Sequence, residues 1–269
     1  MNILLLGGYY MLVWFINLNP IYQALLATLF TWSITCLGAS LVFLFKKINK
    51  FIMDAMLGVA GGIMISASFW SLLNPSIEMA KNLKIHVLII CLGFLFGGLL
   101  LFIGDKIFDK FSNNKESSLK RVVMLMSSIT LHNIPEGLVV GVAFGSLIYD
   151  SGNLLEAILL AVGIGLQNFP EGTAVSVPLR REGMSTKKAF FFGQLSGIVE
   201  PISGVIGALL VLKIKTLLPF LLAFAAGAMI YVVVEEIIPE SQTNDRKDLM
   251  ALFTIIGFLI MMILDVTLG

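Results

Sequence analysis

The chain has 269 residues, of which 58% are hydrophobic and only 13% are charged, and its mean hydropathy is +0.95. A soluble domain carries about 25% charged residues, so this composition excludes a water-soluble globular protein and indicates that a bilayer is the solvent. The net charge of +1 excludes the strongly basic surface that is typical of nucleic-acid binding.

Eight apolar runs are long enough to cross a bilayer as helices, which takes about 20 residues each. In chain order they cover residues 20–45, 52–73, 85–104, 121–149, 154–179, 188–212, 217–239 and 248–268. The sequence therefore predicts an all-α, polytopic membrane protein in which residues 20–269 form one transmembrane domain. A shorter apolar run, Ile3–Ile16, lies in a separate segment, residues 1–19, and predicts an interfacial segment or a marginal extra helix.

The positively charged residues indicate how the spans are oriented. Of the 18 Lys and Arg, 14 lie in the loops after the first, third, fifth and seventh spans. Cytoplasmic loops are enriched in Lys and Arg, so these four loops are predicted to be cytoplasmic and both ends of the eight-span core to face outward. The longest of them, at about residues 105–120, is polar and predicts a solvated linker. No GxxxxGK[ST] phosphate-binding loop occurs, so we expect no ATPase activity.

Two ten-residue stretches inside these apolar runs nearly repeat each other. They are LHNIPEGLVV from Leu131 and LQNFPEGTAV from Leu166, and six of their ten positions are identical. Residues three and four apart share one face of a helix, so each stretch places three polar side chains together. These are His132, Asn133 and Glu136 in the first stretch, and Gln167, Asn168 and Glu171 in the second. A further acid, Glu200, lies in the sixth span.

Carboxylates at this depth need a partner. Each acid at the centre of a span costs about 2.5–3.5 kcal/mol, so Glu136, Glu171 and Glu200 together would cost on the order of 10 kcal/mol. No Lys or Arg lies deep in any span. A bound divalent cation would offset this cost, and an imidazole with carboxylate and amide oxygens suits zinc, iron(II), manganese or cadmium.

The Pro-Glu-Gly triplets also have a structural meaning. Pro135 and Pro170 cannot donate a backbone hydrogen bond, so each predicts a kink and a free carbonyl beside the polar face. Gly137 and Gly172 allow another helix to approach closely, and further glycine pairs at GxxxG spacing predict ordinary helix packing.

The paired HNIPEG and QNFPEG sequences within eight spans resemble the ZIP family of divalent-metal transporters, in particular its bacterial GufA-like branch. The resemblance extends from about Pro20 to Gly269, and it implies a two-metal site halfway across the membrane. One metal would be held by His132, Glu136, Gln167 and Glu171, with Met64 nearby. The second would be held by Asn133, Asn168 and Glu200, with Glu136 and Glu171 as bridges. The resemblance also implies a metal pathway along Ser71, Glu236, Asp265, Asp54 and Glu78.

Two positions depart from the family pattern. Many members have His where Gln167 stands, and some have Asp where Asn168 stands, so the two amides are expected to weaken the second metal position. The linker at about 105–120 also lacks the histidine cluster that is common in the family.

We therefore expect a secondary transporter of the inner (plasma) membrane that moves Zn²⁺, or a similar ion such as Fe²⁺, Mn²⁺ or Cd²⁺, into the cytoplasm by alternating access. Its expected partners are divalent metal ions and membrane lipid, with no nucleic acid, and a homodimer is left open. Two alternatives share the same ligands: an intramembrane dimetal hydrolase, and a passive divalent-cation channel. No HExxH sequence supports the hydrolase. Proton coupling is not decided by the sequence.

Overall fold

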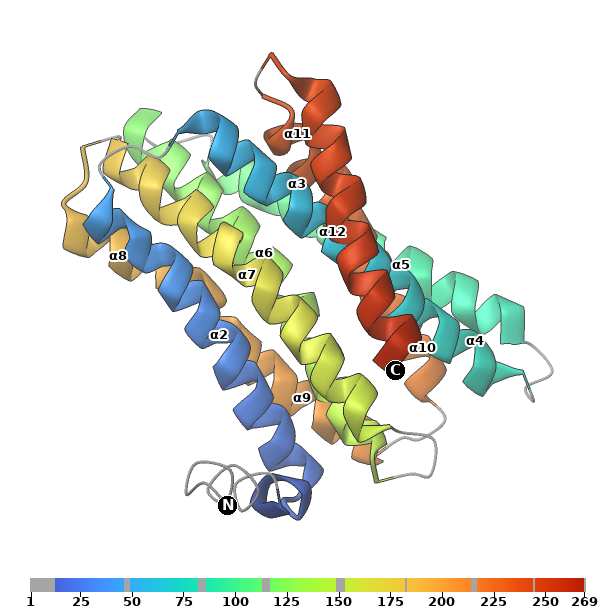
Figure 1. Cartoon of the computed structure of the whole chain (residues 1–269). Coiled ribbons are helices and arrows are strands. Elements are labelled where there is room, and N and C mark those ends of the chain that lie inside the picture. Colours follow the sequence, from blue (N-terminus) through green and yellow to red (C-terminus); the bar gives the residue numbers. More distant parts are fainter. Residues whose placement is uncertain are drawn as a thin grey trace.

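The structure is a computed structural model that describes residues 13–45, 49–81, 86–112, 117–148, 153–181, 183–213, 217–243 and 245–268. The side chains of residues 108–129, Leu131 and His132 lie outside the described part. Every described element is a helix (Figure 1).

The helices follow the order of the predicted spans. The first is α2 (Pro20–Leu44). The second span is composite: α3 (Lys50–Ala67), the π-helix η1 (Ser68–Leu73) and α4 (Asn74–Ala80). The next three are α5 (His86–Ser112), α6 (Ser117–Ser146) and α7 (Leu154–Arg181). The sixth contains α8 (Thr186–Leu195), the 3₁₀ turn η2 (Ser196–Ile198) and α9 (Val199–Lys213). The seventh contains α10 (Leu218–Val232), the π-helix η4 (Val233–Ile237) and α11 (Ile238–Ser241), and the last is α12 (Lys247–Leu268).

Seven helices in the described part of the chain are long and apolar enough to cross a membrane. They are Pro20–Leu44, Lys50–Ala80, Val87–Ile107, Leu154–Arg180, Thr186–Leu212, Leu218–Ser241 and Lys247–Thr267. Seven of the eight predicted spans are thus confirmed as candidate membrane helices. The fourth predicted span lies in α6, which has 30 residues but is not among the seven over the part that the structure describes.

The predicted linker at about 105–120 needs correction. Helix α5 continues to Ser112 and α6 begins at Ser117, so most of this polar segment is helical. The physical reason is that the end of an apolar run marks where a helix leaves the hydrocarbon, and a helix satisfies its own backbone groups in water as well as in lipid.

Each of the two π-helices is followed closely by a proline. Helix η1 ends at Leu73, two positions before Pro75, and helix η4 ends at Ile237, two positions before Pro239. A proline ring collides with the carbonyl four residues earlier, and a widened turn relieves that collision. The second and seventh spans therefore share one local design that hydropathy alone does not reveal.

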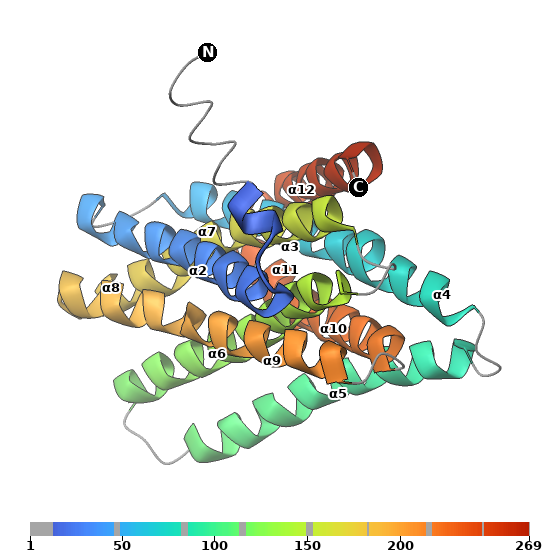
Figure 2. The ribbon, with the colours of Figure 1, turned by 90° about the horizontal axis from the view of Figure 1, so that it is seen from below.

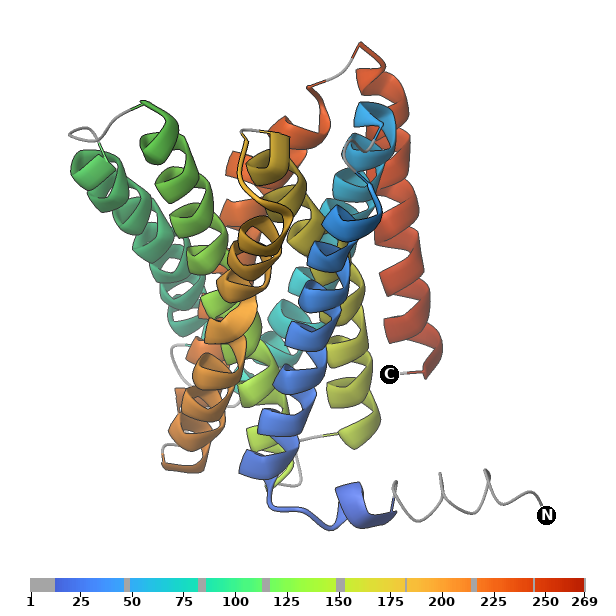
Figure 3. The ribbon, with the colours of Figure 1, turned by 90° about the vertical axis from the view of Figure 1, so that its left-hand side faces the viewer.

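Glycines bring four pairs of helices into close contact. A β-carbon at Gly141 of α6 would overlap the carbonyl of Gly204 in α9, and one at Gly38 of α2 would overlap the carbonyl of Phe169 in α7. The pairs α5–α10 and α3–α12 are packed in the same way, at Gly97 and Gly62 respectively. Figure 3 shows α9 beside both α6 and α2. The GxxxG prediction of helix packing is confirmed at Gly62, Gly97 and Gly141, whereas Gly38 belongs to none of the predicted pairs.

The helices differ in how much of their surface the bundle covers. In the most apolar stretch of each span, 61% of residues are buried in α7, against 22% in α5 and 17% in α12. Viewed from below, α5 and α12 lie at opposite edges of the bundle (Figure 2). Their exposed faces carry large apolar residues such as Leu95 and Ile256, as expected for contact with lipid. The site residues Glu136 of α6 and Gln167 of α7 are, by contrast, fully buried.

The predicted N-terminal segment falls mostly outside the described residues, which begin at Val13. Residues 13–16 are helical, and the buried amide of Gln23 donates to the carbonyl oxygens of Phe15 and Ile16 at 2.9 and 3.3 Å. This contact ties the end of the segment to α2.

Candidate metal centre

The two Pro-Glu-Gly stretches meet through a hydrogen bond between α6 and α7. Gln167 Nε2 donates to Glu136 Oε1 at 2.7 Å, and both residues are fully buried. Pro135 and Pro170 lie inside these helices, one position before Glu136 and Glu171. The structure thus joins the two repeated stretches at their polar faces.

A second hydrogen-bonded group connects α7 to α9 and α2. Asn168 Nδ2 donates to Glu200 Oε2 at 2.9 Å and contacts the carbonyl oxygen of Thr31 at 3.2 Å. The hydroxyl of Thr31 donates to the same carboxylate oxygen at 2.5 Å, and the hydroxyl of Thr35 lies 3.4 Å from both Glu200 Oε1 and the carbonyl oxygen of Thr31. Glu200 therefore has donors on both carboxylate oxygens.

The other oxygens of the cluster have no donor. Six of its buried acceptor atoms have no hydrogen-bond partner among the described residues: Asn133 Oδ1, Glu136 Oε2, Gln167 Oε1, Asn168 Oδ1 and both carboxylate oxygens of Glu171. Buried acceptors are normally satisfied by a donor, so a group of six needs an explanation. A cation satisfies several acceptors at once, and this is the set of atoms that could hold one.

The carboxylates also influence one another. Glu171 and Glu200 both act electrostatically on Glu136, and Glu236 of η4 acts on Glu171. The three buried acids of the sequence prediction therefore lie within electrostatic range of one another, and Glu236 lies within range of Glu171.

Of two further predicted ligands, Met64 and His132, the structure describes only the side chain of Met64. Met64 of α3 is fully buried and belongs to the main hydrophobic core, together with residues such as Ile63 and Val139. The side chain of His132 lies outside the described residues. Among the described side chains, no group of three or more His, Cys, Asp and Glu residues could hold a metal ion by itself. The described cluster instead combines carboxylates with the side-chain amides of Gln167 and Asn168.

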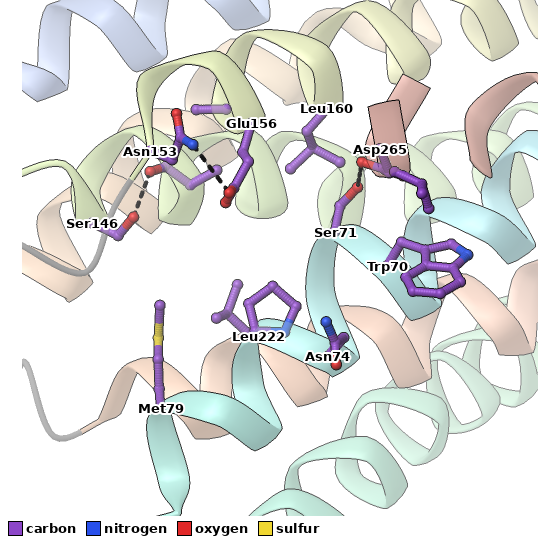
Figure 4. A pocket seen from close by; sticks show the side chains of 14 residues that line it. Trp70, Ser71, Asn74, Met79, Ser146, Asn153, Glu156, Leu160, Leu222 and Asp265 are labelled. Atoms are coloured by element: carbon purple, nitrogen blue, oxygen red, sulfur yellow. Dashed lines mark hydrogen bonds between the residues drawn. The ribbon is translucent and has the colours of Figure 1, made fainter. Parts of the chain in front are cut away.

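A cavity of about 350 Å³ opens among the ends of α4, α6, α7 and α12 (Figure 4). On one side Ser71 Oγ donates to Asp265 Oδ1 at 2.9 Å, while Asp265 Oδ2 has no partner. On another side Asn153 Nδ2 donates to Glu156 Oε1 at 3.1 Å, and Glu156 acts electrostatically on Asp265. Two residues predicted for the pathway, Ser71 and Asp265, thus line one polar cavity.

The two remaining pathway residues lie elsewhere. Asp54 of α3 is buried, and the hydroxyl of Thr243 donates to its Oδ2 at 3.4 Å. Glu78 is on the exposed surface of α4, where it forms an ion pair with Lys81 at 2.5 Å. The structure brings Glu78 to neither the cavity nor the buried cluster.

The sequence interpretation missed the contribution of α2. Thr28, Thr31 and Thr35 are all buried, and they recur at spacings of three and four residues in an otherwise apolar helix. Residues at this spacing share one helix face, so the three threonines could have predicted a polar contact of this helix from the sequence. Asn153 and Glu156 were also missed, since they lie at the beginning of α7, where a polar residue is ordinary.

The fold and the site define a polytopic helical membrane protein with a cluster of acids and amides at the centre of its bundle. The sequence profile of the ZIP Zinc transporter family matches residues 109–265. Zinc transporter ZIP11 of Xenopus tropicalis is 38% identical, over 93% of this chain and 98% of that protein. Zinc transporter ZIP11 of Bos taurus is 37% identical over the same shares. Zinc transporter GufA of Myxococcus xanthus is 32% identical, over 91% of this chain and 98% of its own. The chain belongs to the ZIP zinc transporter family, which consists of transporters and not of enzymes.

Proposed function

We propose that the chain carries Zn²⁺, or a similar ion such as Fe²⁺, Mn²⁺ or Cd²⁺, into the cytoplasm through the cluster between α6, α7 and α9. The observation that carries this proposal is the group of six buried oxygens without a donor, all on α6 and α7. Within the membrane such a group is costly unless an ion occupies it. The printed names of its relatives, as zinc transporters, agree with zinc as the first candidate.

The first ion position uses Glu136, Gln167 and Glu171. Their free oxygens provide carboxylate and carbonyl ligands, and Asn133 adds another oxygen beside them. His132, one turn before Glu136, would complete this position with a nitrogen ligand. Met64 would lie close by on α3, which packs against α7.

A second ion position would use Asn133, Asn168 and Glu200, with Glu136 and Glu171 as bridges. It is the weaker of the two in this chain. Both oxygens of Glu200 accept hydrogen bonds, and the amide hydrogens of Asn168 are directed at Glu200 and at the Thr31 carbonyl. A binuclear site would therefore fill one position well before the other.

The route to this site has an outer and an inner part. The cavity with Ser71 and Asp265 would receive the ion from outside, because it lies at the ends of spans that the Lys and Arg distribution turns outward. Glu236, at the edge of the buried acids, and Asp54, at the start of α3, would lead the ion toward the cytoplasm.

The orientation completes this scheme. We propose that α6 crosses the membrane as well, so that residues 20–269 form one eight-span domain in the inner (plasma) membrane with both ends of the core outside. The connection near residues 113–116 would then be cytoplasmic.

The packing of the helices supports alternating access. The site-bearing α6 and α7 are packed through glycines against α9 and α2, and the α2–α9 contact is also hydrogen-bonded through Glu200. The pairs α3–α12 and α5–α10 form separate close contacts. We infer that the first group shifts against the second and so exposes the site to one side of the membrane at a time.

Flux into sealed proteoliposomes tests this function. Purified protein should take up Zn²⁺ with a saturable rate, and uptake should stop when the site is altered as described below. A rate that rises linearly with Zn²⁺ at ion-channel turnover would favour the passive channel. Absence of uptake, with intact vesicles and correctly inserted protein, would overturn the proposal. Repeating the measurement with a proton gradient tells whether protons are coupled.

A further inference from the structure

The carboxylate of Glu200 differs from the other two buried acids in the number of donors that reach it. Three hydrogen bonds end on Glu200, whereas Glu136 receives one from Gln167 and Glu171 receives none that the structure records. Two of the three donors are hydroxyls of α2, a helix that the family resemblance does not include among the ligand-bearing spans.

Thr31 and Thr35 are separated by one helical turn, and both side chains are inaccessible to solvent. The Thr31 hydroxyl lies 2.5 Å from Glu200 Oε2 and 3.0 Å from the carbonyl oxygen of Thr28. A hydroxyl has one proton to donate, and the shorter contact has the length of a charge-assisted bond. The proton of Thr31 is therefore directed at Glu200.

These hydrogen bonds limit what Glu200 can offer to an ion. A carboxylate has about four lone-pair sites, and three of them face Thr31, Thr35 and Asn168. An ion at the second position would have to compete with these donors for Glu200, while Glu136 and Glu171 keep free oxygens for the first position.

We propose that Thr31 and Thr35 are positioning residues that hold the Glu200 carboxylate away from the transported ion. This inference rests on the proposed function and deepens it. The two hydroxyls keep Glu200 as a nearby negative charge and prevent it from closing on the cation as a further ligand. The cation is then bound firmly enough for capture and loosely enough for release.

The test is a comparison of two isosteric substitutions on the same face of α2. Thr31→Val removes the hydroxyl that reaches Glu200 and keeps the side-chain volume. Thr28→Val removes a buried hydroxyl that contacts only carbonyl oxygens of its own helix, those of Ala24 and Leu25. Thr31→Ser restores the donor without the methyl group.

We expect Thr31→Val to lower the half-saturation concentration for Zn²⁺ about tenfold, since a hydrogen bond to a charged group is worth at least that factor. The maximal uptake rate should fall because release slows, and calorimetry on purified protein should show more Zn²⁺ bound per chain. Thr31→Ser should bring all three quantities back toward those of the unaltered protein, and Thr28→Val should leave them unchanged. A role in packing alone predicts the opposite order, since Ser loses the methyl group that Val keeps.

The inference is overturned if Thr31→Val matches Thr28→Val, or if it weakens Zn²⁺ binding. Either outcome for Thr31→Val can be interpreted only when the unaltered protein takes up Zn²⁺. If the unaltered protein shows no uptake in the same vesicles, the proposed function itself fails, so the two failures are distinguishable. Thr35→Val serves as a second variant, with a smaller shift in the same direction because its contact is longer.

Discussion

The amide of Gln167 on α7 donates to the carboxylate of Glu136 on α6 at 2.7 Å, in the fully buried centre of the bundle. The bond uses one oxygen of Glu136 and leaves the other, together with the Gln167 carbonyl, without a donor. A neutral amide therefore fixes the acid without cancelling its charge. The negative charge of Glu136 therefore remains available to attract a cation.

Removing either bridging acid should abolish uptake. Glu136→Ala and Glu171→Ala each take away oxygens that no neighbouring side chain replaces, and Glu171 contributes two of the six free acceptors. We expect Zn²⁺ uptake at the background of empty vesicles, with protein levels in the membrane unchanged. Uptake at the normal rate by either variant would contradict a shared ion site on α6 and α7.

The metal content should be dominated by one ion. With Zn²⁺ or Cd²⁺ at limiting concentration, anomalous diffraction should give one strong peak beside Glu136 and Glu171, with His132 within ligand distance. Two equally occupied peaks would show that the hydrogen bonds on Glu200 do not weaken the second position. A main peak near residues 113–116 would contradict the assignment of the site.

Replacing the amide of Asn168 by a carboxylate should strengthen the second position. Asn168→Asp removes two amide hydrogens that face Glu200 and the Thr31 carbonyl, and it adds an acid beside Glu200. We expect a lower half-saturation concentration, an unchanged or lower maximal rate, and more metal per chain by elemental analysis. Gln167→Glu is the matched control, because it should act mainly on the first position. No change in either metal content or half-saturation would exclude Asn168 from the ligand shell.

If the cavity beside Ser71 and Asp265 is the entrance, it should determine how well the protein captures ions at low concentration. Asp265→Asn keeps a partner for the Ser71 hydroxyl but removes the charge. Half-saturation should rise about tenfold with little change in maximal rate, since focused charge raises local cation concentration by at least this factor. The effect should shrink as ionic strength rises.

Glu78→Gln is the control for this measurement. It removes an acid of the same span that is exposed and paired with Lys81. An equal effect of both substitutions would mean that the cavity is not the entrance.

Neighbouring glycines of α5 offer a test of the packing. A β-carbon at Gly97 would overlap the carbonyl of Phe224 in α10, whereas one at Gly98 would meet its nearest neighbour, the Gly227 carbonyl, at 3.6 Å. We expect Gly97→Ala to destabilise the purified protein by about 1–3 kcal/mol through overpacking. Gly98→Ala should stay within about 1 kcal/mol of the unaltered protein. Thermal unfolding in detergent measures both, and equal midpoints would contradict the α5–α10 contact.

The apolar runs predicted the helices well because a bilayer imposes length and polarity on every span. The repeated acids pointed to the candidate site for a related reason, since carboxylates such as Glu136 and Glu171 are costly within hydrocarbon. The hydrogen bonds of Thr31 and Thr35 could not be predicted in this way. A threonine satisfies itself on its own helix at no cost, so its contact with Glu200 depends on how α2 and α9 pack. The helical extensions after residue 104 and before residue 121 were missed, because a helix does not end where its residues leave the hydrocarbon and enter water.

The π-helices η1 and η4 fix the rotation of the two spans that contain them. An α-helix turns by about 100° per residue, so the one additional residue in a π-turn shifts every later side chain by that angle around the axis. Ser71 lies within η1, and Glu236 lies within η4. The π-turns that precede Pro75 and Pro239 therefore influence the directions in which Ser71 and Glu236, two residues of the proposed ion route, point from their helices. Deleting one residue from η1 would keep the composition of the span and turn its outer end away from Asp265.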